Sequence, residues 1–160
     1  MGHGVICSRT SDEHDYFRAA HVGDLDALSA LLAADTSLAR RGTHYDRLSA
    51  INIAAANGRH EVLSMILDHG VPPDVVNLLN PTPLMLAAMH GKIDCVLMLL
   101  QDGAHILMLD SVHGRSCLHH AAYISHVDCL LVILSAAQTT PVADSCGIAR
   151  IDNLQGRPQR

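Results

Sequence analysis

Cysteine and histidine are the residues of this sequence whose types most readily suggest chemistry. The 160 residues include five cysteines and twelve histidines, side chains that zinc prefers. Zinc sites use closely spaced pairs such as Cys-x-x-Cys, and no two of these cysteines stand at that spacing. Four histidines gather in one stretch but match no zinc pattern, so we expect no metal site. They are His113, His119, His120 and His126.

Catalytic and cofactor-binding patterns are absent from the sequence as well. Serine, histidine and aspartate residues are present, but no nucleophile elbow positions a serine for attack. No glycine-rich loop of the phosphate-binding kind occurs either. We therefore expect no catalytic residue, no cofactor and no enzymatic activity from this chain.

The N-terminus carries the pattern most suggestive of covalent modification. Met1-Gly2 followed by Cys7 resembles a dual-acylation signal, with myristate on Gly2 and palmitate on Cys7. The second lipid would matter, because one myristoyl chain gives only marginal membrane binding. The myristoylation motif has serine or threonine where this chain has Ile6, so an unmodified tail remains the alternative.

Composition limits the classes of protein further. Hydrophobic residues make up 49% of the chain, yet its large aromatic residues are only three tyrosines and one phenylalanine, with no tryptophan. A core of aliphatic side chains suits thin layers of small helices. The net charge of −5 gives no basic surface for nucleic acid. No run of about 18 apolar residues is present to span a membrane, and the odd number of cysteines favours a reducing cytoplasm.

An internal repeat organises the elements that would position any site. The motif Ala-Ala-x-x-Gly occurs three times, and a fourth copy ends in serine instead of glycine. The last positions, here called the marker residues, are Gly23, Gly58, Gly91 and Ser125, at spacings of 35, 33 and 34 residues. A period of about 33 residues is typical of ankyrin repeats, each of which contains two helices.

The residues after each marker predict the second helix of each repeat. An acidic residue stands three positions after every marker, where a carboxylate favours the start of a helix. Aliphatic residues follow at positions five, eight and nine, the spacing of one helical face. We therefore predict an all-α fold, an ankyrin-repeat solenoid of about four helix–turn–helix repeats. In the fourth repeat we expect the apolar side chains of Leu130, Ile133 and Leu134 to be exposed.

The repeat register also divides the chain into segments. Residues 1–11 are a predicted N-terminal tail, and residues 138–160 are an irregular tail that resembles the start of a fifth repeat. The repeats fill residues 12–137, as 12–44, 45–77, 78–111 and 112–137. In the third repeat, residues 82–85 read Thr-Pro-Leu-Met, close to the ankyrin turn sequence Thr-Pro-Leu-His.

The position of a residue within its repeat predicts the role of several individual side chains. Cys95 and Cys129 occupy a position that is small and apolar in the other repeats, so we expect them in the core. His119 occupies the histidine position of the turn sequence and is expected to hydrogen-bond across the turn. Ser125 would cost about 1 kcal/mol or more if its turn requires a positive φ.

Longer strings of the sequence resemble one family. The similarity is to the N-terminal half of plant ankyrin-repeat ubiquitin-protein ligases of the RING type, and it covers residues 1 to about 150. The strings that carry it are MGHGVxC, in which x stands for Ile6, YDRLSA, IAAANGR, EVLSMILD, TPLMLAAMHGKIDCV, LHHAAY and TPVADS.

The resemblance implies a division of labour within a longer protein. In that family the ankyrin part recruits a protein partner, by resemblance a receptor kinase in plant immunity, and a RING finger recruits a ubiquitin-conjugating enzyme. The family also implies that Gly2 and Cys7 are acylated, which predicts a cytoplasmic protein at the inner face of the plasma membrane. A RING finger needs paired cysteine and histidine ligands for two zinc ions, and this chain has none of those pairs.

The sequence leaves four functions open. The chain could be a protein-binding module that engages its partner alone. It could be the substrate-recruiting part of a ubiquitin-protein ligase that acts with a RING-bearing homologue. A truncated copy could instead compete for the partners of the full-length ligase, or have no function.

The variable positions of the repeats predict which residues contact a protein partner. Stacked repeats bind through their turn tips and through the concave face formed by their first helices. At the tips these residues are Leu78, Leu79, Val112, His113 and Arg115. On the first helices they are His21, Val22, Ala56, Asn57, Met89, His90, Tyr123 and Ile124.

Overall fold

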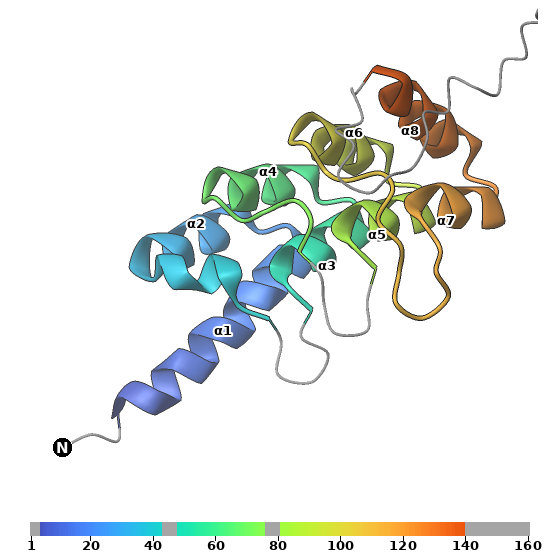
Figure 1. The fold of residues 1–160 in the computed structure, drawn as a ribbon. Coiled ribbons are helices and arrows are strands. Elements are labelled where there is room, and N and C mark those ends of the chain that lie inside the picture. The colour runs from blue at the N-terminus through green and yellow to red at the C-terminus, as the bar shows by residue number, and fades with distance from the viewer. Residues whose placement is uncertain (1–3, 43–47, 76–80, 140–160) are drawn as a thin grey trace, which may run out of the picture.

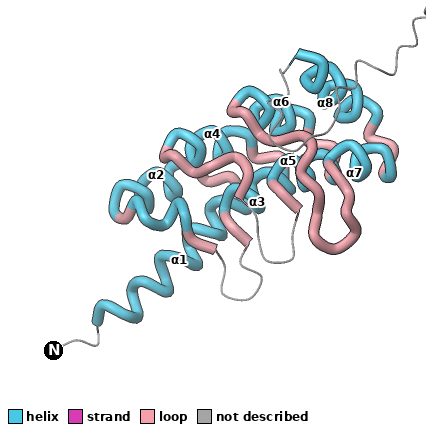
Figure 2. The backbone as a smooth tube through the Cα atoms, viewed as in Figure 1, coloured by secondary structure: helices cyan, strands magenta, loops and turns pink. Residues whose placement is uncertain are grey.

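A computed structural model describes residues 4–42, 48–75 and 81–139 as an elongated stack of helices (Figure 1). These residues form eight α-helices, one short 3-10 helix and no strand (Figure 2). The first helices of the four repeats are α1 (Gly4–Val22), α3 (Ala50–Asn57), α5 (Pro83–Met89) and α7 (Cys117–Tyr123). The second helices are α2 (Leu25–Ala34), α4 (His60–Asp68), α6 (Ile93–Gln101) and α8 (Val127–Thr139), and η1 (Thr36–Arg40) follows α2.

The helices lie in two layers. Each first helix packs against the first helix of the next repeat, and the second helices form a row alongside them, above the first helices in Figure 1. Neighbouring first helices meet through small side chains, since Ala54, Ala55 and Ala87 are completely buried. The second helices fill the remaining space with aliphatic groups such as Ile66 and Leu99. The predicted all-α ankyrin-repeat solenoid is confirmed.

The marker residues form the turns between the two helices of each repeat. Gly23, Gly58 and Gly91 have φ of 91°, 74° and 65°, values that favour glycine. Ser125 adopts the same left-handed conformation, with φ of 63°. The turn therefore does require a positive φ at this serine, as the expected energetic cost assumed. A serine in this conformation costs about 1 kcal/mol or more relative to glycine.

The helix ends confirm the expected acidic residues at the start of each second helix. The Asp24 carboxylate accepts a hydrogen bond from the Ala27 amide at 3.1 Å and so caps α2. An acidic residue lies in the first turn of each second helix, as predicted: Asp26, Glu61, Asp94 and Asp128. His119 Nδ1 accepts from the Ser116 amide at 3.2 Å, which is the hydrogen bond expected across the turn.

Three features differ from the sequence-based expectations. Residues 4–11, expected in the N-terminal tail, belong to α1, and α8 continues two residues past the predicted repeat boundary to Thr139. The rest of the predicted C-terminal tail lies outside the described residues. Ile133, expected to be exposed, is fully buried, and Leu130 is half-buried, whereas Leu134 is exposed as predicted. Ile133 is covered because α8 packs directly on α6.

Candidate partner-binding site

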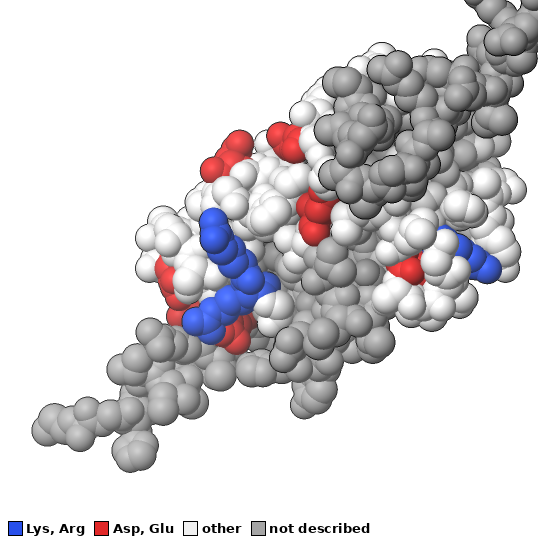
Figure 3. Space-filling model, viewed as in Figure 1, with Lys and Arg blue, Asp and Glu red and all other residues white. Residues whose placement is uncertain are grey.

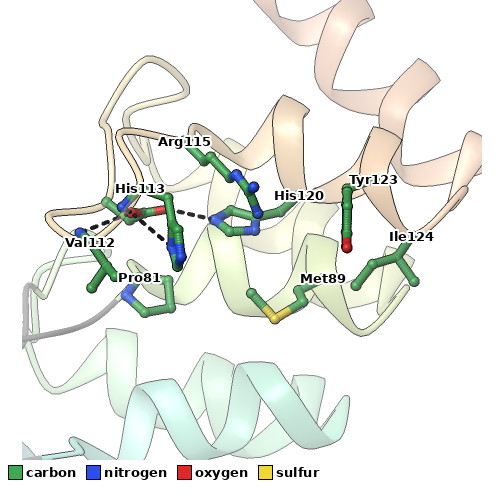
Figure 4. A pocket seen from close by; sticks show the side chains of 9 residues that line it. Pro81, Met89, Val112, His113, Arg115, His120, Tyr123 and Ile124 are labelled. Atoms are coloured by element: carbon green, nitrogen blue, oxygen red, sulfur yellow. Dashed lines mark hydrogen bonds and ion pairs between the residues drawn. The ribbon is translucent and has the colours of Figure 1, made fainter.

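A pocket opens where α5, α7 and the turn before α7 meet (Figure 4). Its volume is about 290 Å³. We call it the α5–α7 pocket. Its lining residues are Pro81, Met89, Asp110, Val112, His113, Arg115, His120, Tyr123 and Ile124.

Six residues predicted to contact a partner line this pocket. They are Met89, Val112, His113, Arg115, Tyr123 and Ile124. They come from three separate elements, the end of α5, the turn at 110–115 and the end of α7, and the stacking of repeats three and four brings them together. Sequence reasoning missed Asp110 as part of this site. The one feature of the sequence that pointed to this role was the position of Asp110 in a turn, four residues before Gly114.

The other predicted contact residues lie elsewhere. His90 is exposed at the end of α5 but does not line the pocket. His21, Val22, Ala56 and Asn57 belong to the first two repeats, and Asn57 Nδ2 donates to the Ile53 carbonyl at 2.8 Å. Leu78, Leu79 and Gly2 lie outside the described residues. Cys7 falls within α1, and its side chain is not among those described.

Asp110 organises the turn that forms one wall of the pocket. Its Oδ1 accepts hydrogen bonds from the amides of Val112, at 3.1 Å, and His113, at 2.5 Å. Its Oδ2 lies 2.9 Å from Nε2 of His120 on α7. The carboxylate is only 4% exposed, so these donors replace the water it would otherwise bind. The Asp110 amide donates to the Arg115 carbonyl at 2.9 Å and closes the turn.

The hydrogen bonds around Asp110 set its charge state. The His113 amide, the His120 side chain and the Val112 amide together lower the pKa of the Asp110 carboxyl to about 2, although burial acts in the opposite direction. Asp110 is therefore ionised at neutral pH and can only accept hydrogen bonds. It follows that His120 carries a proton on Nε2 and donates to Asp110, which joins the turn to α7.

The mouth of the pocket presents apolar surface and one arginine. Val112, Tyr123 and Ile124 are 59%, 76% and 44% exposed, which is high for side chains of this size. The guanidinium carbon of Arg115 lies 5.3 Å from the centre of the Tyr123 ring, within the range of a cation–π contact. Figure 4 shows Met89 across the pocket from Arg115 and His120. Such a surface can bind a protein or peptide.

The cysteines of the repeats serve the core, as predicted for two of them. Cys95 and Cys129 are buried, and Cys117 is buried as well. Burial raises the pKa of the Cys95 thiol to about 11 and that of Cys117 to about 12. Because the thiolate is the reactive form, these side chains are unreactive at neutral pH.

The described parts of the chain contain neither a cluster of metal ligands nor a membrane-spanning helix. No three histidine, cysteine or acidic side chains there are grouped so as to hold a metal ion. None of the described helices combines the length and the apolar character needed to cross a bilayer.

Comparison with known proteins agrees with the fold. The family model for ankyrin repeats in three copies matches residues 16–110, more than half of the chain, and the chain belongs to this family. Among curated proteins it is 74% identical over 155 residues to E3 ubiquitin-protein ligase XB3 of Oryza sativa subsp. japonica. It is 57% identical to the probable E3 ubiquitin-protein ligase XBOS31 of the same species. It is 46% identical to the putative E3 ubiquitin-protein ligase XBAT31 of Arabidopsis thaliana.

These matches cover almost all of this chain but only part of each relative. The aligned residues are 97% of this chain and 34% of XB3, 35% of XBOS31 and 34% of XBAT31. The chain therefore spans about a third of the length of the relatives it matches. It resembles an ankyrin-repeat portion of plant ubiquitin-protein ligases.

Proposed function

We propose that this chain is the partner-binding ankyrin module of a plant ubiquitin-ligase lineage and that it binds a protein through the α5–α7 pocket. The observation that carries the proposal is the convergence of six predicted contact residues on one pocket. By resemblance, the partner is the cytoplasmic domain of a receptor kinase in plant immunity, and the module works in the cytoplasm.

Truncation of the two large side chains at the α5–α7 pocket tests this function. The double variant Met89→Ala/Tyr123→Ala is expected to weaken binding of a purified receptor-kinase cytoplasmic domain by about 30-fold or more, the effect of losing one interface hot spot. Isothermal titration calorimetry measures the dissociation constant. Far-UV circular dichroism should be unchanged, because Tyr123 is 76% exposed and Met89 is only half-buried.

A matched control separates the pocket from general surface effects. Leu131→Ala removes an apolar side chain that is 57% exposed on α8, outside the pocket. This variant should bind like the wild type. If the double variant also binds like the wild type, the partner uses another surface and the pocket has no part in binding.

A second candidate function follows from the names of the relatives, which are ubiquitin-protein ligases. The chain would then recruit substrate to a RING-bearing homologue, or compete with that homologue for its partner. In a ubiquitination assay with XB3, added wild-type chain should raise or lower modification of the shared partner. The Met89→Ala/Tyr123→Ala chain should do neither, and an equal effect from both chains would exclude a role for the pocket.

Acylation of Gly2 and Cys7 would place the module at the inner face of the plasma membrane. The N-terminal sequence and the family resemblance support this part of the proposal. In plant cells the wild-type chain is expected in the membrane fraction. Gly2→Ala and Cys7→Ser should each move most of it to the soluble fraction, because one lipid gives only marginal binding. A wild-type chain found in the soluble fraction would exclude acylation as its anchor.

A further inference from the structure

The α5–α7 pocket combines an apolar interior with a cation at its mouth. Its volume of about 290 Å³ lies at the lower end of the range for ligand sites, so it suits one or two side chains of a peptide. Met89, Val112 and Ile124 supply the apolar surface. These properties favour an apolar anchor residue from the partner.

Arg115 is placed to select the charge beside that anchor. Among the described residues it has no hydrogen bond or ion pair to a carboxylate, and its contact is the Tyr123 ring. No other lysine or arginine occurs between Lys92 and Arg150. In Figure 3, the one basic side chain visible near α7 is well separated from those over the first repeat. The guanidinium therefore keeps its five donors available at the mouth of the pocket.

The acid in the pocket, Asp110, already has hydrogen-bond partners within the chain. Both oxygens of Asp110 already accept hydrogen bonds, from two backbone amides and from His120. Its side chain is only 4% exposed, so it offers little accessible surface to a ligand cation. A cationic partner group would meet Arg115 without a free carboxylate to pair with, whereas a carboxylate would gain a charge-assisted hydrogen bond.

We propose that the α5–α7 pocket recognises an acidic–apolar peptide segment, in which a large apolar side chain enters between Met89 and Ile124 and a neighbouring Asp or Glu carboxylate binds Arg115. The inference rests on the proposed function and adds the chemistry of the segment that is bound. Arg115 is the residue that determines specificity, and the stacked Tyr123 ring holds its guanidinium over the mouth.

Selection from a random peptide library tests the inference. Phage displaying random dodecapeptides are selected on the 160-residue chain and then counter-screened on Met89→Ala/Tyr123→Ala to keep pocket-dependent sequences. These sequences are expected to be enriched in Asp or Glu next to a leucine, isoleucine, methionine or aromatic residue. A fluorescein-labelled copy of the most enriched peptide then gives dissociation constants by anisotropy.

Three arginine substitutions test whether the binding of the peptide depends on the charge and shape of Arg115. Arg115→Met keeps the length of the side chain but not its charge, and should weaken binding about tenfold or more, the effect of losing one hydrogen bond between charged groups. Arg115→Lys keeps the charge without the planar fork and should fall between Arg115→Met and the wild type. Arg18→Met, on the exposed surface of α1, should have no effect. Replacing the peptide's Asp or Glu with its amide should match the loss in Arg115→Met.

The possible results separate the inference from the proposed function. Pocket-dependent peptides that lack acidic residues, or that bind Arg115→Met as well as the wild type, would overturn the inference and leave the binding function intact. If no selected peptide depends on Met89 and Tyr123, both the inference and the role of the pocket fall.

Discussion

Leu99→Ala is expected to lower the free energy of unfolding by about 2–5 kcal/mol. Leu99 is fully buried in α6, and α6 packs against α4, α5 and α8. The substitution removes buried apolar surface and leaves a cavity that close-packed neighbours fill only in part. The loss is large against the total of about 5–15 kcal/mol that is typical of a folded domain.

The position of Leu99 makes this loss affect the whole stack. In a repeat protein each repeat is stabilised mainly by its neighbours, so a weakened third repeat also separates the fourth from the first two. Urea unfolding followed by far-UV circular dichroism should show a lower midpoint than that of the wild type. Leu97→Ala is the control, because Leu97 is 41% exposed on the same helix. Equal midpoints for the two variants would contradict the described packing of α6.

Most of the fold could be predicted from the sequence because its local rules repeat. The marker residues locate the turns between the two helices of each repeat, and even Ser125, which breaks the glycine pattern, has the positive φ of the three glycines. Acidic residues at one register position mark the first turns of the second helices. Cys95 and Cys129 were placed in the core by the same register, and both are buried. These features need only the spacing within one repeat.

The site was predicted only in part because it depends on contacts between elements. The register identified Tyr123 and Arg115 as outward-facing residues, but it contains no information about which of these residues share a pocket. The Asp110–His120 hydrogen bond joins a turn to a helix across ten positions of sequence. This hydrogen bond forms only when the turn folds back on α7, and the repeat pattern of the sequence does not predict that contact.

The burial of Ile133 shows a second limit of sequence reasoning. The repeat pattern predicts that the aliphatic residues of α8 lie on one side of the helix. It does not predict which of them contact α6. The structure turns Ile133 toward the core and leaves Val127, Leu131 and Leu134 exposed. The orientation of α8 about its own axis determines which side chains are buried, and the packing of α6 against α8 sets that orientation.

Asp110→Asn is expected to destabilise the chain at pH 7 and to weaken partner binding at the α5–α7 pocket. The amide cannot accept hydrogen bonds at both of its terminal atoms, whereas the Asp110 carboxylate accepts from Val112, His113 and His120. The turn would then lose part of its support, and Val112 and Arg115 would lose their fixed places in the wall. Titration with the receptor-kinase domain or with the selected peptide measures the loss of affinity.

The pH dependence of stability isolates the contribution of the Asp110 charge. The pKa of Asp110 is about 2 in the folded chain, below the value of about 3.9 for an aspartate in an unfolded chain. The unfolded state therefore binds a proton first as the pH falls, and the stabilisation by this charge, complete above about pH 5, is lost between there and about pH 2. The gap in unfolding free energy between wild type and Asp110→Asn should narrow over the same interval.

A charge-matched variant completes the test of Asp110. Asp102→Asn removes an exposed carboxylate at the end of α6 and changes the net charge of the chain by the same amount. It should leave stability at pH 7 and binding close to the wild type. If Asp110→Asn behaves like Asp102→Asn at pH 7, the hydrogen bonds of Asp110 do not support the turn. A gap that stays constant down to pH 2 would mean that its charge adds nothing to stability.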